Sequence, residues 1–142
     1  EDVTCLAAIQ RVTLNKKLFQ SFEPLEVDVV YDVYQEMKDL QIGVAIYSSD
    51  RKIYVFGPNT NLDKYPLPQQ AGRYQMRYRI PKLALMSGDY VIDVGIFNSD
   101  GIVNLDYRNG CKAFSVANEY FSEGMIYLEH EWDVEKLTTE EN

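Results

Sequence analysis

The sequence predicts an all-β fold, a β-sandwich of about eight short strands. Hydrophobic residues recur at every second position in several segments, which is the period of a strand with one buried face. Turn-forming residues separate these segments at short intervals, and no segment has the periodicity of an amphipathic helix. A closed β-barrel is the alternative that this pattern leaves open. The 142 residues are expected to form one domain, 1–142, with an ordered core of about 5–132 and an acidic tail, 133–142.

The clearest strand is Leu25–Tyr34, in which five apolar residues alternate with a mostly polar set. The other expected strands are, in chain order, Cys5–Leu14, Asp39–Ser48, Lys52–Phe56, Arg73–Ile80, Gly88–Phe97, Ile102–Leu105, Cys111–Val116 and Met125–Trp132. Asn15–Glu23 is expected to be a polar connection, and Asn109-Gly110 a kink. Gly57–Gly72 is longer than most connections, so we expect a functional loop or a crossover between sheets.

Gly88–Phe97 is expected to be the central strand, with a hairpin turn at Asp100-Gly101 after it. Its inward residues are Tyr90, Ile92, Val94 and Ile96. At mid-strand its outward side offers only Asp93 and Gly95. Because a glycine inside a strand often marks a close approach, we expect something to lie against this bare patch.

Charge distinguishes the two outer faces of the sandwich. Leu25–Tyr34 directs acids outward and Arg73–Ile80 directs bases outward, namely Glu26, Asp28 and Asp32 against Arg73, Arg77 and Arg79. Opposite charges across neighbouring antiparallel strands stabilise by about 0.2–1 kcal/mol per pair. We therefore expect these strands to be neighbours, with a solvated, structural outer face. Asp39–Ser48, Lys52–Phe56 and Gly88–Phe97 are expected to form the other sheet, whose outer face is weakly charged.

The composition excludes some partners and favours others. The net charge of −8 argues against nucleic acid and anionic membranes, because both bind clustered cations. The 11 tyrosines suit strands and also surfaces that stack on polar ligands such as sugars. Cys5 and Cys111 are expected to be reduced and buried, since a chain of this size needs no disulfide. We find no signal peptide or transmembrane run.

Motifs for catalysis or for cofactor and metal binding are missing from the sequence, so we expect neither an enzyme nor a cofactor. The single histidine, His130, is more typical of a strand position than of a metal ligand. Asn98, Asn104 and Asp106 flank a turn that offers oxygen ligands for calcium, but the spacing favours an ordinary hairpin. Asp93 with Asp106 would supply the two carboxylates of a glycosidase, although such pairs occur by chance in an acidic protein.

A series of landmarks, read in chain order, resembles one protein family. They are FEPLEV (Phe22–Val27), IGVAIYSSD (Ile42–Asp50), VFGPNT (Val55–Thr60), LALMSGDYVIDVGIF (Leu83–Phe97), AFSV (Ala113–Val116), Gly124 and YLEHEW (Tyr127–Trp132). Over roughly Cys5 to Trp132 they resemble the C-terminal carbohydrate-binding domain of Wzt-type ATP-binding subunits of bacterial polysaccharide (O-antigen) ABC exporters. The resemblance implies an immunoglobulin-like antiparallel β-sandwich.

The resemblance also implies a function, a non-catalytic domain that recognises the O-antigen-like glycan to be exported, often at its modified end. The implied partners are an ATP-binding domain preceding Glu1, a membrane-spanning exporter subunit, and a second copy in a homodimer that exchanges the strand Met125–Trp132. The implied location is cytoplasmic, at the inner face of the cell membrane. A dimerisation or protein-interaction sandwich with strand exchange and no glycan ligand is the alternative.

The candidate glycan-binding residues come from the outer face of the weakly charged sheet, because the family offers no binding motif to transfer. Sugars need an aromatic plane for their C–H face and planar polar groups for their hydroxyls, in a shallow groove. The residues that supply these groups are Gln41, Tyr47, Tyr54, Asp93, Phe97, Asn98, Asn104 and Tyr107. The alternative for each is an ordinary sheet-surface residue that a dimer partner covers.

Overall fold

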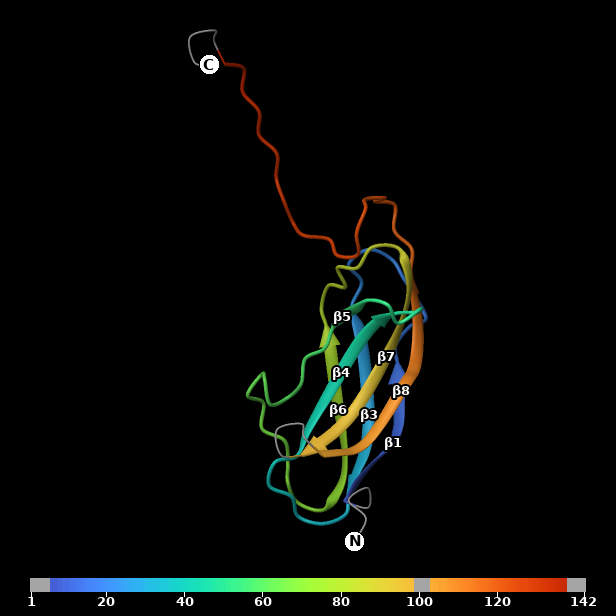
Figure 1. Ribbon diagram of the computed structural model, residues 1–142, viewed down its shortest axis with the longest axis vertical. Helices are drawn as coiled ribbons and strands as arrows, with labels where there is room; N and C mark the ends of the chain where they lie inside the picture. The colour runs from blue at the N-terminus through green and yellow to red at the C-terminus, as the bar shows by residue number, and fades with distance from the viewer. Residues whose placement is uncertain (1–5, 99–102, 138–142) are drawn as a thin grey trace.

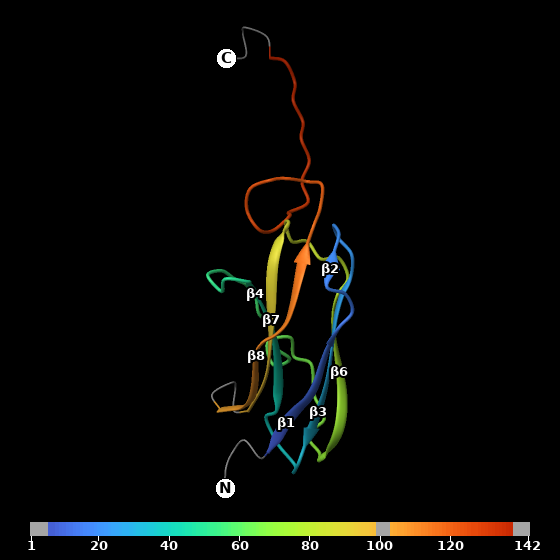
Figure 2. The same cartoon turned by 90° about the vertical axis from the view of Figure 1, so that its right-hand side faces the viewer.

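The computed structural model describes residues 6–98 and 103–137, whose strands form two sheets packed face to face (Figure 1, Figure 2). The three-stranded sheet has the order β1-β3-β6, and consists of β1 (Ala7–Leu14), β3 (Leu25–Val33) and β6 (Gly72–Ile80). The five-stranded sheet has the order β2-β8-β7-β4-β5, and consists of β2 (Leu18–Phe19), β4 (Gln41–Ser48), β5 (Tyr54–Phe56), β7 (Gly88–Asn98) and β8 (Val103–Val116). The two sheets confirm the predicted all-β sandwich, and the alternative of a closed barrel is wrong.

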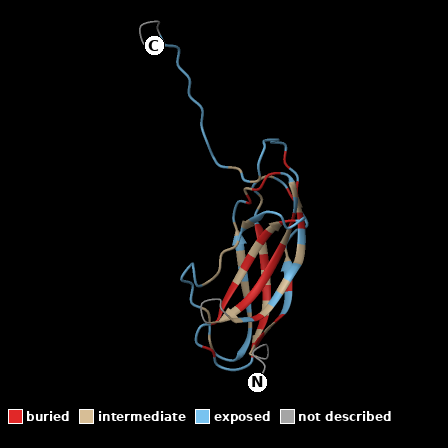
Figure 3. Cartoon of the chain, in the orientation of Figure 1, coloured by how far each residue is buried: buried red, intermediate tan, exposed pale blue. Residues whose placement is uncertain are grey.

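The core lies between the two sheets, and alternating residues that the sequence pattern places inward form much of it (Figure 3). The inward side chains of β3 and β7 are buried, namely Leu25, Val27, Val29, Tyr31, Val33, Tyr90, Ile92, Val94 and Ile96. Burial of apolar surface contributes about 25 cal/mol per Å², so these rows provide the main stabilisation of the fold. A membrane-spanning helix is not found in the described part of the chain.

The connection between β1 and β3 differs from the prediction. The connection Asn15–Glu23 contains the short strand β2, which pairs in parallel with Ser115 and Val116 of β8. Phe19 of this strand is buried, with its ring 5.5 Å from that of Phe114. Two residues are too few to show a periodicity, which is why the sequence pattern misses this strand.

The two short strands expected on either side of Asn109-Gly110 form one strand, β8, of 14 residues. The predicted kink remains as an irregularity, because the register with β7 shifts opposite Ile92 and Val94 and Gly110 has a φ of 57°. The turn expected at Asp100-Gly101 lies outside the described residues. Cys111 of this strand is a half-buried free thiol, whereas Cys5 lies outside the described residues.

The last predicted strand, Met125–Trp132, is wrong for most of its length. Ile126 makes an isolated bridge with Leu85, supported by hydrogen bonds from the N–H of Met86 to the Met125 carbonyl (2.7 Å) and from the N–H of Tyr127 to the Ala84 carbonyl (2.8 Å). The chain then runs away from the sandwich, where both views show it without a neighbouring strand (Figure 1, Figure 2). A strand needs a partner for its backbone groups, and the described part of this single chain supplies none here.

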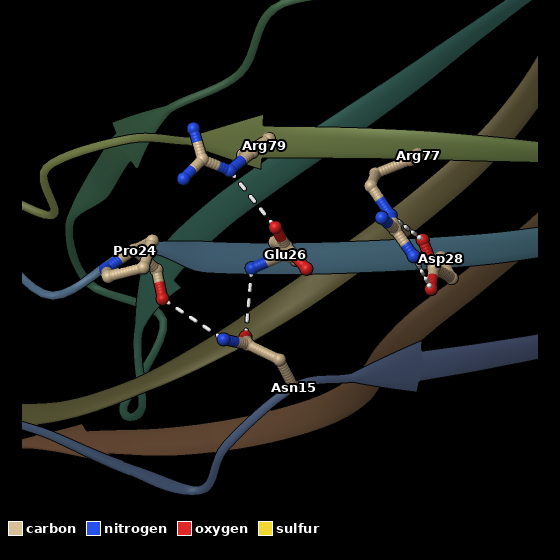
Figure 4. Close-up of polar contacts among 6 residues, drawn as sticks. All are labelled: Asn15, Pro24, Glu26, Asp28, Arg77 and Arg79. Carbon is tan, nitrogen blue, oxygen red and sulfur yellow. Dashed lines mark hydrogen bonds and ion pairs between the residues drawn. The ribbon is translucent and has the colours of Figure 1, made fainter.

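The charged outer face of the three-stranded sheet confirms the predicted pairing of β3 with β6 (Figure 4). The register places Asp32 opposite Arg73, Asp28 opposite Arg77, and Glu26 opposite Arg79. Their ion pairs have nitrogen–oxygen distances of 2.7, 2.8 and 3.0 Å, respectively. The complementary charges of these two strands therefore predict their pairing correctly.

The open edge between β1 and β8 is held by side chains rather than by a strand ladder. β1 is an edge strand of the three-stranded sheet, and a bulge at Gln10 interrupts its pairing with β3. Asp106 accepts a hydrogen bond from the N–H of Ile9 (2.7 Å), and Arg108 donates one to the Ile9 carbonyl. These contacts join the two sheets along an edge that would otherwise expose unpaired backbone groups.

Candidate functional site

The outer face of the five-stranded sheet contains a shallow hollow of about 140 Å³. Its floor is made of small residues on two central strands, Gly43, Ala45 and Gly95. Aromatic rings of Tyr54, Phe97 and Tyr107 and the connection after β5, residues 57–59, enclose it. The hollow thus combines aromatic walls with an open floor, on the face that the sequence predicted to be a contact surface.

Gly95 is not bare, because two rings of the same chain cover it. A Cβ atom at this position would lie 2.6 Å from Cζ of Phe97 and 2.7 Å from Cδ2 of Tyr107. The two rings meet edge to face, with centroids 6.2 Å apart. The close approach expected at this glycine is therefore confirmed, and within the described chain the approaching groups are the aromatic side chains of Phe97 on β7 and Tyr107 on β8.

Asp93 lies beside this glycine with a buried side chain, 1% exposed. Its carboxylate accepts hydrogen bonds from the guanidinium of Arg51, from the hydroxyl of Tyr107 (2.6 Å) and from the N–H of Gly110 (2.7 Å). Burial by itself raises the pKa of Asp93, but these hydrogen bonds outweigh it and hold the pKa below its ordinary value. Tyr107 responds in the opposite direction, since burial and the neighbouring carboxylate raise its pKa.

Arg51 belongs to the tight turn between β4 and β5, and its backbone adopts a φ of 62°. The guanidinium binds Asp93 through two nitrogens, at 3.1 and 2.8 Å, and lies over the ring of Tyr47 at 4.3 Å from its centroid. Tyr47 in turn stacks on Tyr54, with centroids 4.5 Å apart and planes 20° apart. The sequence predicts only that Arg51 lies in a turn, because no periodicity indicates where the side chain of a turn residue points.

The structure does not bring the eight candidate residues together at one point. Tyr54, Asp93, Phe97 and Tyr107 line the hollow, and Tyr47 stacks on Tyr54 without lining it. Gln41 of β4 and Asn104 of β8 flank Phe97 in the strand register, and Asn98 follows at the end of β7. Gln41 is buried, only 5% exposed, so little of its side chain is accessible to a ligand. The Oδ1 atom of Asn98 is buried without a hydrogen bond to the described residues.

A second cavity, of about 500 Å³, opens between the edge strand β6 and the connection after β5. Tyrosines dominate its lining, namely Tyr31, Tyr65, Tyr74 and Tyr78. Burial raises the pKa values of Tyr31 and Tyr78 to about 12, so both hydroxyls stay protonated at neutral pH. Sequence reasoning predicted that Tyr74 and Tyr78 point inward, but the cavity depends on how residues 57–70 fold across the sheet edge.

The residues considered for metal binding and for glycoside hydrolysis are not brought together in the described part of the chain. The described residues contain no group of three side chains of the histidine, cysteine, aspartate or glutamate type placed to hold a metal ion. Asp106, the partner of Asp93 in the glycosidase alternative, is hydrogen-bonded to Ile9 on β1 and does not line the hollow. His130 is exposed, with Nδ1 2.7 Å from the carbonyl oxygen of Leu128.

Comparison with known structures agrees with this architecture. A crystal structure of the C-terminal domain of wzt matches with a TM-score of 0.79 at 15% identity, covering 92% of this chain and 84% of that one. A Niemann-Pick type C2 protein from the Japanese carpenter ant matches with a TM-score of 0.55 at 8% identity, covering 80% of this chain and 93% of that one. At such identities these likenesses show the fold alone.

Comparison of the sequence with known families gives the assignment. No curated protein matches the chain significantly. The family model described as the Wzt C-terminal domain matches residues 7–128, from the start of β1 to just beyond the bridge at Ile126. This match covers most of the chain and includes the landmarks from Phe22 to Gly124. The chain therefore belongs to the Wzt C-terminal domain family.

Proposed function

We propose that this domain is a non-catalytic carbohydrate-binding module of an ATP-binding subunit in a bacterial polysaccharide ABC exporter, and that it binds the glycan to be exported. Membership of the Wzt C-terminal domain family supports the exporter context. In that context the partners are an ATP-binding domain, a membrane-spanning exporter subunit and an O-antigen-like glycan, at the cytoplasmic face of the membrane. Nucleic acid is not a partner in this proposal, since the net charge is −8.

The observation that carries the proposal is the aromatic hollow on the outer face of the five-stranded sheet. Tyr54, Phe97 and Tyr107 surround a floor of small residues, and Tyr54 is more than half exposed. Sugar rings bind such sites because their C–H faces stack on aromatic planes while nearby polar groups satisfy their hydroxyls. The opposite outer face carries three exposed ion pairs, which suit solvent better than a glycan.

Titration with glycans tests this proposal directly. Purified bacterial O-polysaccharides of known composition are titrated into the ¹⁵N-labelled domain, and the affected amides are mapped by NMR. We expect at least one glycan to shift the signals of β4, β7 and β8 around the hollow, and Tyr54→Ala with Phe97→Ala to abolish the effect. Shifts confined to other surfaces, or no shift with any glycan, would contradict the proposal.

A second candidate function, dimerisation by strand exchange, is favoured by the segment that leaves the sandwich. Side chains of alternate residues in this segment are apolar and exposed, namely Ile126, Leu128, Trp132 and Val134. Leu128 is 75% exposed and Trp132 is 91% exposed. Such alternation is typical of a strand with one buried face, and a lone chain does not bury it. We infer that a second copy of the chain receives this segment.

Sedimentation analysis distinguishes the two states of association. We expect the 142-residue chain to sediment as a dimer, and the variants Leu128→Asp and Trp132→Asp to dissociate it into folded monomers. Thr138→Asp, in the same tail, serves as the control that adds the same charge without removing an apolar side chain. A wild-type chain that stays monomeric at high concentration would rule out the exchange.

A further inference from the structure

Asp93 lies in the wall of the hollow, but its carboxylate has no free acceptor position. Oδ1 accepts hydrogen bonds from Nη1 of Arg51 (3.1 Å) and from the N–H of Gly110 (2.7 Å). Oδ2 accepts from Nη2 of Arg51 (2.8 Å) and from the hydroxyl of Tyr107 (2.6 Å). A carboxylate has about four acceptor sites, so these four donors use its capacity. A ligand in the hollow would have to displace one of them to bind Asp93 directly.

Arg51 has the opposite character, because its side chain is 38% exposed and keeps unused donors. A guanidinium has five N–H groups, of which the contacts with Asp93 use two. No other acceptor among the described residues binds this side chain. The guanidinium is nevertheless fixed in place, since Asp93 holds its end and the ring of Tyr47 lies against its face. Fixed donors at a partly exposed position are what a binding site needs.

We propose that Arg51 is the hydrogen-bond donor of the glycan site, and that Asp93 is the residue that positions it. This inference rests on the proposed glycan-binding function and changes the assignment of two residues. Asp93, a candidate contact residue from the sequence, acts through Arg51 instead. Arg51, which sequence reasoning missed, adjoins the hollow through Asp93 without lining it, and supplies its remaining N–H groups to the part of the ligand that extends past the hollow.

The charges at the site also define the chemical class of the ligand. The positive charge of Arg51 is balanced by the carboxylate of Asp93 at 2.8 Å. A carboxylate or phosphate on the ligand would therefore meet a pair with no net charge, rather than a free cation. The hydroxyl oxygens of a neutral sugar accept hydrogen bonds from the guanidinium and need no charged partner, while Tyr54 and Phe97 contact the sugar ring. The site fits a neutral sugar residue better than a uronic acid or a phosphorylated one.

An NMR experiment on the 142-residue chain tests both parts of this inference. The probes are the methyl glycosides of mannose, glucose and galactose, and glucuronic acid as the anionic counterpart. The readouts are the Nε–H signal of Arg51, its rate of exchange with water, and the backbone amides around the hollow. We expect at least one neutral glycoside to shift the Arg51 signal, with an affinity that changes little with salt, and glucuronic acid to bind more weakly.

Variants separate contact from positioning. Arg51→Gln is expected to weaken binding of the neutral glycoside about tenfold or more, because it removes charged donors. Asp93→Asn keeps Arg51 but removes its charged partner, so it is expected to weaken binding of the glycoside. It should also accelerate the exchange of the Arg51 Nε–H with water in the free protein. If Asp93→Asn fails to fold, Tyr107→Phe serves in its place, because it removes one hydrogen bond that holds Asp93 and should accelerate the Arg51 Nε–H exchange to a smaller extent. Arg73→Gln breaks a matched arginine–aspartate pair on the other sheet and should leave binding unchanged.

The outcomes distinguish this inference from the function on which it rests. A glycoside that binds at the hollow with equal affinity in Arg51→Gln would overturn the role of Arg51 and leave the proposed function intact. Unchanged Nε–H exchange in Asp93→Asn would overturn the positioning role of Asp93. Preferred binding of glucuronic acid would overturn the assignment to neutral sugars. Absence of binding by every glycoside and polysaccharide would overturn the proposed function, and the ligand role of Arg51 with it.

Discussion

The two outer faces of the sandwich use the same ion pair in different surroundings. On the three-stranded sheet, Arg77 and Asp28 pair at 2.8 Å with side chains 55% and 26% exposed. On the five-stranded sheet, Arg51 and Asp93 pair at 2.8 Å with side chains 38% and 1% exposed. The first pair is one of three in a solvated ladder, whereas the second is surrounded by aromatic rings. The same chemistry therefore stabilises strand pairing on one face and organises a candidate site on the other.

The contribution of an ion pair to stability therefore depends on its surroundings. Exposed pairs contribute little to stability, since water screens the charges and the side chains lose entropy. A buried carboxylate depends on its partners much more strongly, because removing one of them leaves a polar group unsatisfied. We expect substitutions on the two faces to differ accordingly, and the following experiments test that expectation.

The largest effect is expected for Asp93→Ala. This change removes the acceptor of Arg51, Tyr107 and Gly110 at once, and we expect a loss of about 2–4 kcal/mol in the free energy of unfolding. The value is at the low end for a buried pair because Arg51 reaches solvent. Urea denaturation followed by tyrosine fluorescence measures it. A loss as small as that of an exposed pair would contradict the contrast between the faces.

The next effect is expected for Gly95→Ala, which tests the ring contacts that the charged face lacks. The added methyl group would lie within 2.7 Å of both Phe97 and Tyr107, so the rings must move and the free energy of unfolding should fall by about 1–3 kcal/mol. Gly43→Ala is the matched control on the neighbouring strand, where the nearest atom is 3.4 Å away, and it should change stability by no more than about 0.5 kcal/mol. Equal effects at both glycines would contradict the close approach at Gly95.

Low pH is expected to destabilise the ion pairs on both faces. Hydrogen bonding with Arg77 lowers the pKa of Asp28, and the pKa of Asp93 is also lowered because its hydrogen bonds outweigh the effect of burial. A carboxyl with a lowered pKa in the folded state contributes stability that is complete above its unfolded pKa, about 3.9, and is lost as the pH falls through the folded value. We therefore expect the free energy of unfolding to fall below about pH 4.

The variant Asp93→Asn identifies the share of this acid sensitivity that belongs to the site. It should show a shallower dependence of stability on pH than the wild type between about pH 4 and pH 2. Denaturation curves across this range, at low and at high salt, provide the measurement. Added salt should reduce the contribution of Asp28 more than that of Asp93, since exposed charges are screened more strongly. An identical pH dependence in both proteins would show that Asp93 is not part of the effect.

The smallest effect is expected for Asp28→Ala on the charged face. One exposed pair is lost, so the free energy of unfolding should fall by less than about 1 kcal/mol, and high salt should abolish the difference. Thermal denaturation at two salt concentrations is sufficient to measure it. A loss as large as that of Asp93→Ala would mean that the ladder is more than a solvated surface.

Much of the fold could be predicted because its signals are local and repeated. The alternation in Leu25–Tyr34 gave β3 and its buried face, and the charges on Glu26, Asp28 and Asp32 predicted its neighbour β6. The failures have physical causes as well. Leu18–Phe19 is too short to show a period, and Met125–Trp132 shows the alternation of a strand without a partner in its own chain.

The candidate site was predictable only in part. The outer face and its residues Tyr54, Asp93 and Phe97 at the hollow follow from strand alternation, as does Tyr47 beside Tyr54, whereas Tyr107 was named only as a residue near this face. Arg51 does not follow from alternation, because its direction depends on a left-handed backbone conformation in a turn and on an acceptor 42 positions later. The tyrosine-lined cavity beside β6 was also missed, since it depends on how the connection 57–70 crosses the sheet edge.

The sequence was sufficient to predict most of the strands, the inward rows of β3 and β7, the pairing of the charged strands and the family. These depend on periodicity and on charge complementarity, which are written along the chain and survive any change in loop geometry. The tertiary structure alone decided that the rings of Phe97 and Tyr107 cover Gly95, and that Asp93 is occupied by Arg51. Such contacts join residues from different strands and a turn, so their distances are fixed only when the sheets have packed.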